Sequence, residues 1–257
     1  MSESEKLQIP HDANEQPLAV TLLVIGVGVG WLANYLGMIR KSFQDRTYCM
    51  PLVALACNIS YELVYVLYPP DSPMWPIVFG LWLAVDVAVA YTTMRFGPNE
   101  WGHAPLVQRN LPWILVASIA GWITVHLALI AHFGPVEAAA WSAFGCQLFL
   151  SAANLCQLMV RGSSRGTSPF IWLTRFMGTA IVLPHEILRY KNKDPTVFWN
   201  NPLGWWGGAA FYVFDISYGI LLWKILRSER TVAVKSGGKE GPITVEKSRV
   251  KQVGSAP

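Results

Sequence analysis

The chain has 257 residues, of which 53% are hydrophobic and only 14% are charged, and it carries a formal net charge of +4. Soluble domains carry about 25% charged residues, so this composition excludes an ordinary soluble enzyme and indicates an integral membrane protein. The twelve tryptophans are typical of a chain with many membrane–water interfaces.

Seven apolar segments follow a polar stretch, residues 1–17, which lacks the basic start of a signal peptide. The segments cover residues 18–39, 50–68, 75–95, 111–132, 138–159, 169–188 and 203–226. Most are about 20 residues long, enough to cross a hydrocarbon core of about 30 Å, and the breaks between them are rich in Pro, Gly and Asp. We therefore predict an all-α fold, a seven-transmembrane-helix bundle that forms one domain over residues 18–227.

Two further expectations concern the sixth segment and the end of the chain. Pro184 lies inside the sixth segment, and a proline within a helix removes one backbone hydrogen bond, so we expect a kink there. Residues 228–257 contain Lys, Gly and Ser without an apolar period. Such a composition predicts a disordered basic tail that contacts anionic lipid.

Basic residues lie unevenly on the two sides of the predicted bundle. One side holds four, whereas the other holds fifteen, including Arg40, Lys41, Arg46 and eight basic residues from Lys224 onward. Because cytoplasmic loops carry the excess of Lys and Arg, we expect the N-terminus to be lumenal and the C-terminus to be cytoplasmic.

Several ionisable residues fall inside the predicted membrane segments, and they are Glu62, Asp86, His126, Arg175, Glu186 and Asp215. Such residues are costly in a membrane and by default mark a functional site. At 1.5 Å of rise per residue, Glu62, Asp86 and Asp215 lie near the middle of the membrane. By the same count Glu186 lies near the lumenal edge, and Arg175 lies near the cytoplasmic edge, where it can snorkel. His126 is expected to be a hydrogen-bonded core histidine.

Helical spacing surrounds Glu62 and Asp215 with aromatic side chains and few cations. Together with Asp86, these neighbours are the expected substrate-lining residues: Asn58, Tyr65, Asp86, Phe211, Tyr212 and Tyr218. Burial without a counter-ion disfavours a carboxylate, so we expect the acids to hold their protons. A protonated acid in an aromatic cavity is a competent general acid, and aromatic faces stabilise a cation that forms beside them.

This combination suits a reaction that proceeds through carbocations, such as protonation of an epoxide or alkene in a lipid-soluble chain. An apolar pocket excludes the water that would trap the cation. Cyclisation of this kind needs no metal or nucleotide, so no cofactor is expected. The expected partners are membrane lipid and a lipophilic small molecule, and no nucleic acid.

The four cysteines do not predict a metal site or a disulfide. They are Cys49, Cys57, Cys146 and Cys156, and no CxxC motif or local Cys/His cluster accompanies them. Cys146 and Cys156 share one predicted helix, where ten residues separate them by about 15 Å, too far for a disulfide. We interpret these thiols as small buried hydrophobic groups.

Other interpretations of the acids stay open at this point. Glu62 and Asp215 are equally compatible with a hydrogen-bonded pair that only holds the bundle together. A membrane transporter is the alternative function, because acids at the membrane midplane are common where protons or substrates cross. A retinal protein is disfavoured because Lys224 lies at the end of the seventh segment, too shallow for a mid-membrane Schiff base.

Five strings carry a resemblance to a known family. They are "GVGVGWLANYLGMI" (26–39), "CNISYELVY" (57–65), "FGPNEWGHAPLVQRNLP" (96–112), "CQLMVRGSSRGTS" (156–168) and "FDISYG" (214–219). Together they resemble the fungal membrane-integral terpene cyclases of meroterpenoid and indole-diterpene pathways, the pyripyropene- and paxilline-type cyclases. The similarity runs over nearly all of residues 18–230.

The resemblance implies a substrate, a mechanism and two acids. The substrate would be an epoxidised farnesyl or geranylgeranyl chain on a polyketide-derived, aromatic or indole head. The two acids of the family match Glu62 in "SYELVY" and Asp215 in "FDISYG", and one or both would protonate the terminal epoxide. The family also implies the endoplasmic reticulum membrane. The chain contains no DDxxD or DxDD motif, in agreement with a cyclase that does not ionise diphosphates.

Overall fold

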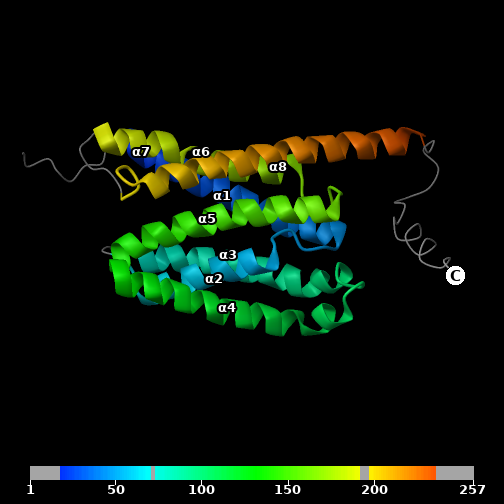
Figure 1. Ribbon diagram of the computed structural model, residues 1–257, viewed down its shortest axis with the longest axis horizontal. Helices are drawn as coiled ribbons and strands as arrows, with labels where there is room; N and C mark the ends of the chain where they lie inside the picture. Colours follow the sequence, from blue (N-terminus) through cyan, green and yellow to red (C-terminus); the bar gives the residue numbers. More distant parts are fainter. Residues whose placement is uncertain (1–17, 71–72, 192–196, 236–257) are drawn as a thin grey trace, which may run out of the picture.

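The computed structural model describes residues 18–70, 73–191 and 197–235, and all regular structure in these residues is helical. The helices run side by side as a bundle (Figure 1). Their bounds are α1 (Leu18–Asp45), α2 (Leu52–Leu67), α3 (Trp75–Phe96), the 3-10 turn η1 (Gly97–Asn99), α4 (Pro105–Phe133), α5 (Pro135–Arg161), α6 (Pro169–Ala180), α7 (Val182–Lys191) and α8 (Pro202–Lys235). Each of the seven predicted segments is therefore helical, which confirms the all-α prediction.

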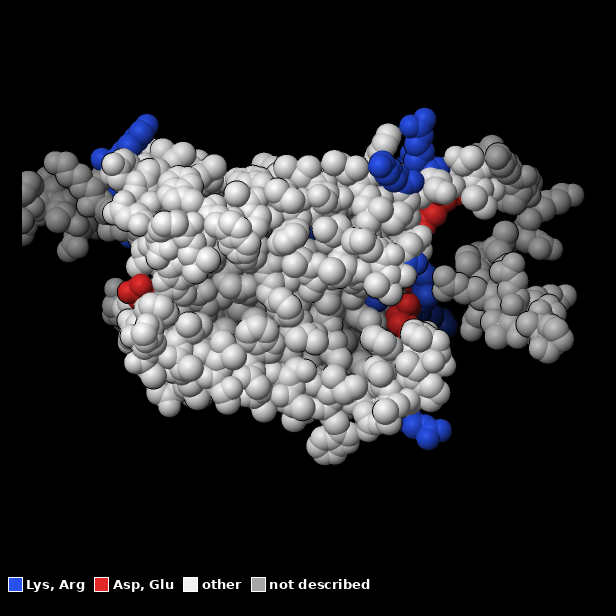
Figure 2. Space-filling model, viewed as in Figure 1, with Lys and Arg blue, Asp and Glu red and all other residues white. Residues whose placement is uncertain are grey.

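Five of the described helices, α1, α3, α4, α5 and α8, are long and apolar enough to cross a membrane. Helix α2 is apolar but shorter, at 16 residues. Their outward faces carry large apolar side chains, among them Leu22, Val29, Leu81 and Trp113. Figure 2 shows charged side chains gathered at the two ends of the bundle and a band between them that is nearly free of charge. A surface of this kind suits a protein whose solvent is lipid.

Helix α5 links two groups of helices. On one side it packs on α2 and α4, with α3 packed behind α2, and on the other side it packs on α8, which also contacts α6. Helix α1 packs on both α3 and α6, so the two groups are joined at two places. The site residues described below are divided between these groups.

The contact between α1 and α6 is unusually close because glycines face each other. A Cβ atom added to Gly30 would lie 2.8 Å from the Cα atom of Gly178, closer than real Cβ atoms approach. Small residues at a helix interface let two backbones touch, and this packing takes the place of the hydrophobic drive that is missing in lipid.

The loops at one end of the bundle are tied together by polar contacts. Arg165 pairs with Glu100 at 3.0 Å, and the backbone N–H of Gly166 donates to Asp45 at 2.8 Å. Ser164 donates to Glu229 through its backbone N–H and its hydroxyl. The ends of α1, α5 and α8 and the loop after α3 therefore meet at one end, as the division of basic residues between two sides requires.

The structure also shows where two expected boundaries lie. The sixth segment is broken at Ile181, between α6 and α7, because Pro184 has no N–H to donate to the carbonyl group four residues earlier. Helix α8 continues to Lys235, so residues 228–235, which we expected in the tail, are helical. The rest of the expected tail and the polar stretch 1–17 lie outside the described residues.

Candidate active site

Two carboxyl groups meet in the interior of the bundle, one from α2 and one from α3. Glu62 is 5% exposed and Asp86 is fully buried. Their carboxyl groups are close enough to interact electrostatically, and both oxygen atoms of Asp86 are buried without a hydrogen-bond partner in the described part of the chain. Two neighbouring carboxylates in an apolar interior repel each other, so this arrangement is favoured only when at least one of the two carboxyl groups carries a proton. This pair is therefore a buried store of at least one acidic proton.

Tyr35 and Asn58 complete the surroundings of the acid pair. The amide Nδ2 of Asn58 donates to the Tyr35 hydroxyl at 2.9 Å, and the Tyr35 side chain in turn lies against Asp86. The ring of Tyr35 also lies 5.6 Å from the ring of Trp82, one turn before Asp86. The acid pair is thus bordered by the aromatic rings of Tyr35 and Trp82, two neighbours that the sequence did not predict.

Asp215 on α8 lies in a different electrostatic setting. Its Oδ1 atom accepts hydrogen bonds from Arg175 Nε at 3.0 Å and Nη2 at 2.6 Å. Both side chains are almost completely buried, so the prediction that Arg175 snorkels to the membrane edge is wrong. The expectation of few cations near Asp215 is wrong for the same reason, because α6 brings a guanidinium directly onto it. An ion pair of this kind requires the carboxylate form of Asp215.

Tyr218 belongs to the same group as this ion pair. The Arg175 guanidinium lies 4.8 Å from the centre of the Tyr218 ring, and the Tyr218 hydroxyl hydrogen-bonds to Thr167 at 2.5 Å. The structure therefore brings Glu62 together with Asn58 and Asp86, and it brings Asp215 together with Arg175 and Tyr218. The two groups bind different partners on different helices.

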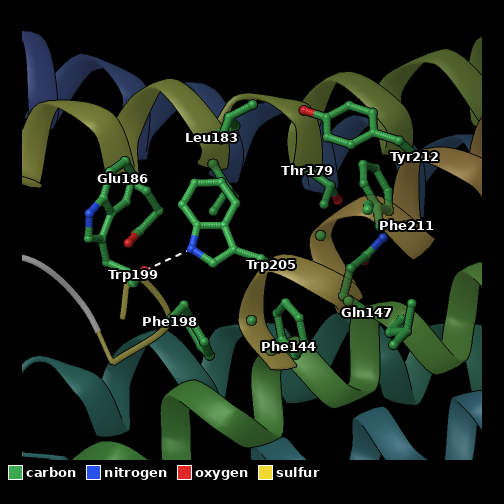
Figure 3. Close-up of a pocket in the computed structure, with 16 residues that line it drawn as sticks. Phe144, Gln147, Thr179, Leu183, Glu186, Phe198, Trp199, Trp205, Phe211 and Tyr212 are labelled. Carbon is green, nitrogen blue, oxygen red and sulfur yellow. Dashed lines mark hydrogen bonds between the residues drawn. The ribbon is translucent and has the colours of Figure 1, made fainter. Parts of the chain in front are cut away.

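An apolar cavity of about 330 Å³ opens between α5, α7 and the start of α8 (Figure 3). The residues that line it are Phe144, Gln147, Leu148, Thr179, Val182, Leu183, Glu186, Phe198, Trp199, Gly204, Trp205, Gly207, Gly208, Ala209, Phe211 and Tyr212. The volume lies within the range of small-molecule sites, and walls made mostly of apolar and aromatic side chains are typical of such sites. Such a cavity suits a lipophilic chain.

The wall of the cavity comes within one helical turn of Asp215 along α8. Its wall includes the predicted residues Phe211 and Tyr212, which come one helical turn before Asp215. Glu62 and Asp215 do not line it, whereas Glu186 does. His185 Nδ1 lies 3.2 Å from Glu186 Oε1, so the acid in the wall of the cavity has an imidazole beside it.

Tyr65 and His126 meet at a third place in the bundle. The Tyr65 hydroxyl hydrogen-bonds to Ser142 on α5 at 2.9 Å, and His126 Nδ1 lies 3.0 Å from the same Ser142 hydroxyl. His126 is thus hydrogen-bonded in the core, as expected. Ser142 was missed because a lone serine in an apolar helix carries no signal of its partners.

The comparisons with known proteins agree on one group of enzymes. A sequence model of the Pyr4-like transmembrane terpene cyclases matches residues 5–228. Terpene cyclase dpmpB of Macrophomina phaseolina is 53% identical over 209 residues, which cover 80% of this chain and 86% of that protein. Terpene cyclase dpfgB of Gibberella zeae is 47% identical, with coverage of 81% and 87%. Terpene cyclase janB of Penicillium janthinellum is 43% identical, with coverage of 84% and 90%.

No solved structure matches this chain. What the relatives share with it is sequence similarity that extends over most of both proteins. The family assignment therefore rests on the sequence, and the contacts of the acids rest on the structure described above.

Proposed function

Because the chain belongs to the Pyr4-like transmembrane terpene cyclases, we propose that it protonates the terminal epoxide of a prenyl chain and cyclises that chain to fused rings. Membership of the family was expected from five strings of the sequence and is confirmed. The chain is a terpene cyclase and an integral membrane protein with a lipophilic terpenoid substrate. The transporter alternative is set aside, because the relatives are cyclases.

The observation that supports the epoxide mechanism is the contact between the Glu62 and Asp86 carboxyl groups. Such a pair holds a proton in an apolar setting and next to aromatic rings, which is what an epoxide needs from a general acid. We assign the donation to Glu62, with Asp86 as the group that shares its proton. In this proposal the rings of Tyr35 and Trp82 stabilise positive charge that develops nearby.

The proposed reaction conserves atoms. The Glu62 proton passes to the epoxide oxygen, the bond from this oxygen to the more substituted carbon breaks, and the alkenes of the chain close rings in turn on the carbon cation. Loss of one proton from carbon ends the sequence and restores the acid. The product is an isomer of the substrate that carries a hydroxyl group where the epoxide was.

Asp215 is the second acid of the proposed mechanism, and its role differs from that of Glu62. Because its carboxylate pairs with Arg175, it is suited to stabilise a distant positive charge or to accept the final proton rather than to donate the first one. Asn58 next to Glu62 and Tyr218 next to Asp215 are proposed to line the substrate site, whereas Tyr65 contacts Ser142 and is not assigned to either acid. The apolar cavity is the proposed way in for the chain, which must pass Phe211 to reach the level of Asp215.

A labelling experiment separates epoxide protonation from alkene protonation. Membranes that contain the chain are supplied in D₂O with a prenylated substrate in two forms, one with a terminal epoxide and one with a terminal alkene. We expect an isomeric cyclised product from the epoxide alone. Its added deuteron lies on the hydroxyl oxygen and is lost on washing with ordinary water. A product with deuterium retained on carbon would contradict the proposal, since it would mean that an alkene is protonated.

The head group and the membrane are further parts of the proposal. The substrate panel is a farnesyl or geranylgeranyl epoxide on polyketide-derived, aromatic and indole heads, and the preferred member defines the class.

We place the chain in the endoplasmic reticulum membrane with its C-terminus in the cytoplasm, because most basic residues lie at that end. A glycosylation acceptor added at either terminus tests this, since only a lumenal terminus is glycosylated.

A further inference from the structure

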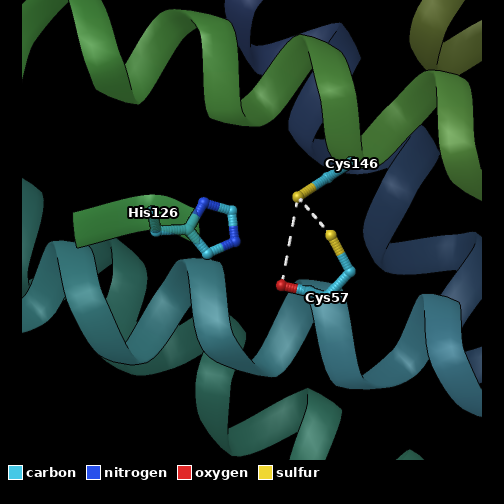
Figure 4. Close-up of side chains that lie close together, drawn as sticks. All are labelled: Cys57, His126 and Cys146. Atoms are coloured by element: carbon cyan, nitrogen blue, oxygen red, sulfur yellow. Dashed lines mark hydrogen bonds between the residues drawn. The ribbon is translucent and has the colours of Figure 1, made fainter. Parts of the chain in front are cut away.

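Three side chains that can ligate a metal meet inside the bundle, one from each of three helices. Cys57 comes from α2, His126 from α4 and Cys146 from α5, and their ligand atoms all lie within 4.8 Å of one another. The two sulfur atoms are 3.3 Å apart. All three side chains are buried. Figure 4 shows the two thiols side by side, with the edge of the imidazole ring turned toward them.

The imidazole of His126 is oriented for an additional partner. Its Nδ1 atom is held by the Ser142 hydroxyl at 3.0 Å, and Ser142 is held in turn by Tyr65. Its Nε2 atom is buried and has no hydrogen-bond partner in the described part of the chain. A buried polar atom without a partner costs about 1–3 kcal/mol. In metal sites, by contrast, a histidine typically binds the metal with one ring nitrogen while the other is fixed by a hydrogen bond.

We propose that Cys57, Cys146 and His126 bind a borderline-soft divalent metal ion, of which Zn²⁺ is the representative. Thiolate and imidazole ligands select such ions over Mg²⁺ and Ca²⁺, which take oxygen ligands. Zinc binds sulfur at about 2.3 Å and imidazole nitrogen at about 2.0–2.1 Å. Ligand atoms spaced from 3.3 Å to at most 4.8 Å reach these distances through small side-chain rotations.

Charge balance supports a divalent ion at this depth in the bundle. Two thiolates and a neutral imidazole cancel the charge of Zn²⁺, so the complete site is neutral, whereas net charge inside a membrane is costly. The two thiols release their protons as the metal binds. Three protein ligands leave one coordination position for a small molecule such as water.

A disulfide between Cys57 and Cys146 is the competing outcome. It would join the two neighbouring sulfur atoms but would leave His126 Nε2 without a partner. It would also not explain why the Ser142 hydroxyl fixes the His126 ring. The metal site uses all three side chains and joins α2, α4 and α5. Because Glu62 follows Cys57 on α2, the metal would also hold the helix that carries the proposed acid.

Metal content of the full-length protein in detergent micelles tests the proposal. After treatment with a chelator under reducing conditions, the protein is loaded with Zn²⁺ and passed through a desalting column. We expect about one zinc ion per chain, as for a single mononuclear site, and loss of most of it in Cys57→Ser and in Cys146→Ser. Cys156→Ser is the matched control, because Cys156 is exposed on the same helix as Cys146, and it should retain the metal.

Two further measurements keep the proposal testable if a cysteine variant fails to fold. In the wild-type protein, Zn²⁺ should protect Cys57 and Cys146 from alkylation, and Co²⁺ should produce thiolate-to-metal charge-transfer bands. Ser142→Ala should weaken zinc binding about 10–100-fold, the usual effect of removing the partner of a ligating histidine. The proposal is overturned if zinc protects neither thiol, or if protein isolated without reductant contains a Cys57–Cys146 disulfide.

Discussion

The Glu62–Asp86 pair and the Asp215–Arg175 pair are two buried acidic sites with opposite electrostatics. In the first, two acids from α2 and α3 face each other, and in the second, an acid on α8 faces a guanidinium from α6. The first pair is favoured when at least one of its two acids carries a proton, whereas the ion pair with Arg175 uses the carboxylate form of Asp215. This difference is the reason that the proposed mechanism gives the two acids different steps of the reaction.

The contrast between the two acidic sites depends most on the assignment of Glu62 as the proton donor. We expect Glu62→Gln to lower the rate of cyclisation about 10²–10⁴-fold, the usual contribution of a general acid, because the amide has no acidic proton to give. The protein should still fold, since the amide can donate a hydrogen bond to Asp86. The measurement is cyclised product formed per mole of folded enzyme.

Glu186→Gln is the control for this substitution, because Glu186 is the acid that lines the cavity. It should retain most of the activity. If Glu186→Gln instead carries the larger loss while Glu62→Gln stays near wild type, the acid lies in the cavity and the assignment of Glu62 fails.

Disruption of the Asp215–Arg175 pair should lower the stability of the folded protein. Arg175→Gln leaves the Asp215 carboxylate buried without its cation, so we expect a loss of about 3–5 kcal/mol in the free energy of unfolding. Denaturant unfolding in detergent micelles measures it. The double variant Arg175→Gln with Asp215→Asn should recover much of this loss, because no charge is then buried. Equal stability of the single and double variants would show that the two side chains are not coupled.

Asp86→Asn tests the role of the second acid in the Glu62–Asp86 pair. The proposed acid Glu62 remains, but the amide introduced on α3 can donate a hydrogen bond to it and so favours its carboxylate form. We expect an activity loss of about 10–100-fold, which corresponds to a hydrogen bond to a charged group of about 1.5–3 kcal/mol. Stability should change much less than in Arg175→Gln. A large loss of stability would mean that Asp86 serves the fold rather than the acid.

The smallest expected effect concerns the cavity near Asp215. A Cβ atom on Gly207 would lie 2.2 Å from the ring of Phe144, so Gly207→Ala should push this ring into the cavity. We expect a loss of about fivefold to tenfold in kcat/KM, the lower end of the effect of one methylene in an apolar pocket. Gly208→Ala is the matched control, because its Cβ meets no atom within 4 Å. Equal kinetics for the two variants would exclude the cavity as the path of the substrate.

The positions of the helices were predictable from sequence because the membrane imposes a simple local rule. A segment of about 20 apolar residues is what crosses the hydrocarbon core, and each predicted segment proved helical. The break near Pro184 was predictable for an equally local reason. Helix α8 runs farther than predicted, to Lys235, because a helix can continue beyond the membrane without an apolar face.

The partners of buried polar residues were much harder to predict. Arg175 was assigned to the membrane edge from its place in the sixth segment, yet it pairs with Asp215 inside the bundle. Cys57, Cys146 and Cys156 were all interpreted as buried thiols, but Cys156 is exposed. In each case the sequence identified the helix that carries the residue, while the direction in which its side chain points depends on neighbouring helices.

By itself the sequence determined the number and order of the apolar helices, the residues that interrupt them with charge, and the family to which the strings around Glu62 and Asp215 belong. Only the tertiary structure decided that Glu62 meets Asp86, that Asp215 meets Arg175, and that Cys57, His126 and Cys146 converge from three helices. The physical reason is that the hydrophobic length of a helix is set by its own residues. Its rotation and the partners that it meets are set by packing against helices far away in the chain.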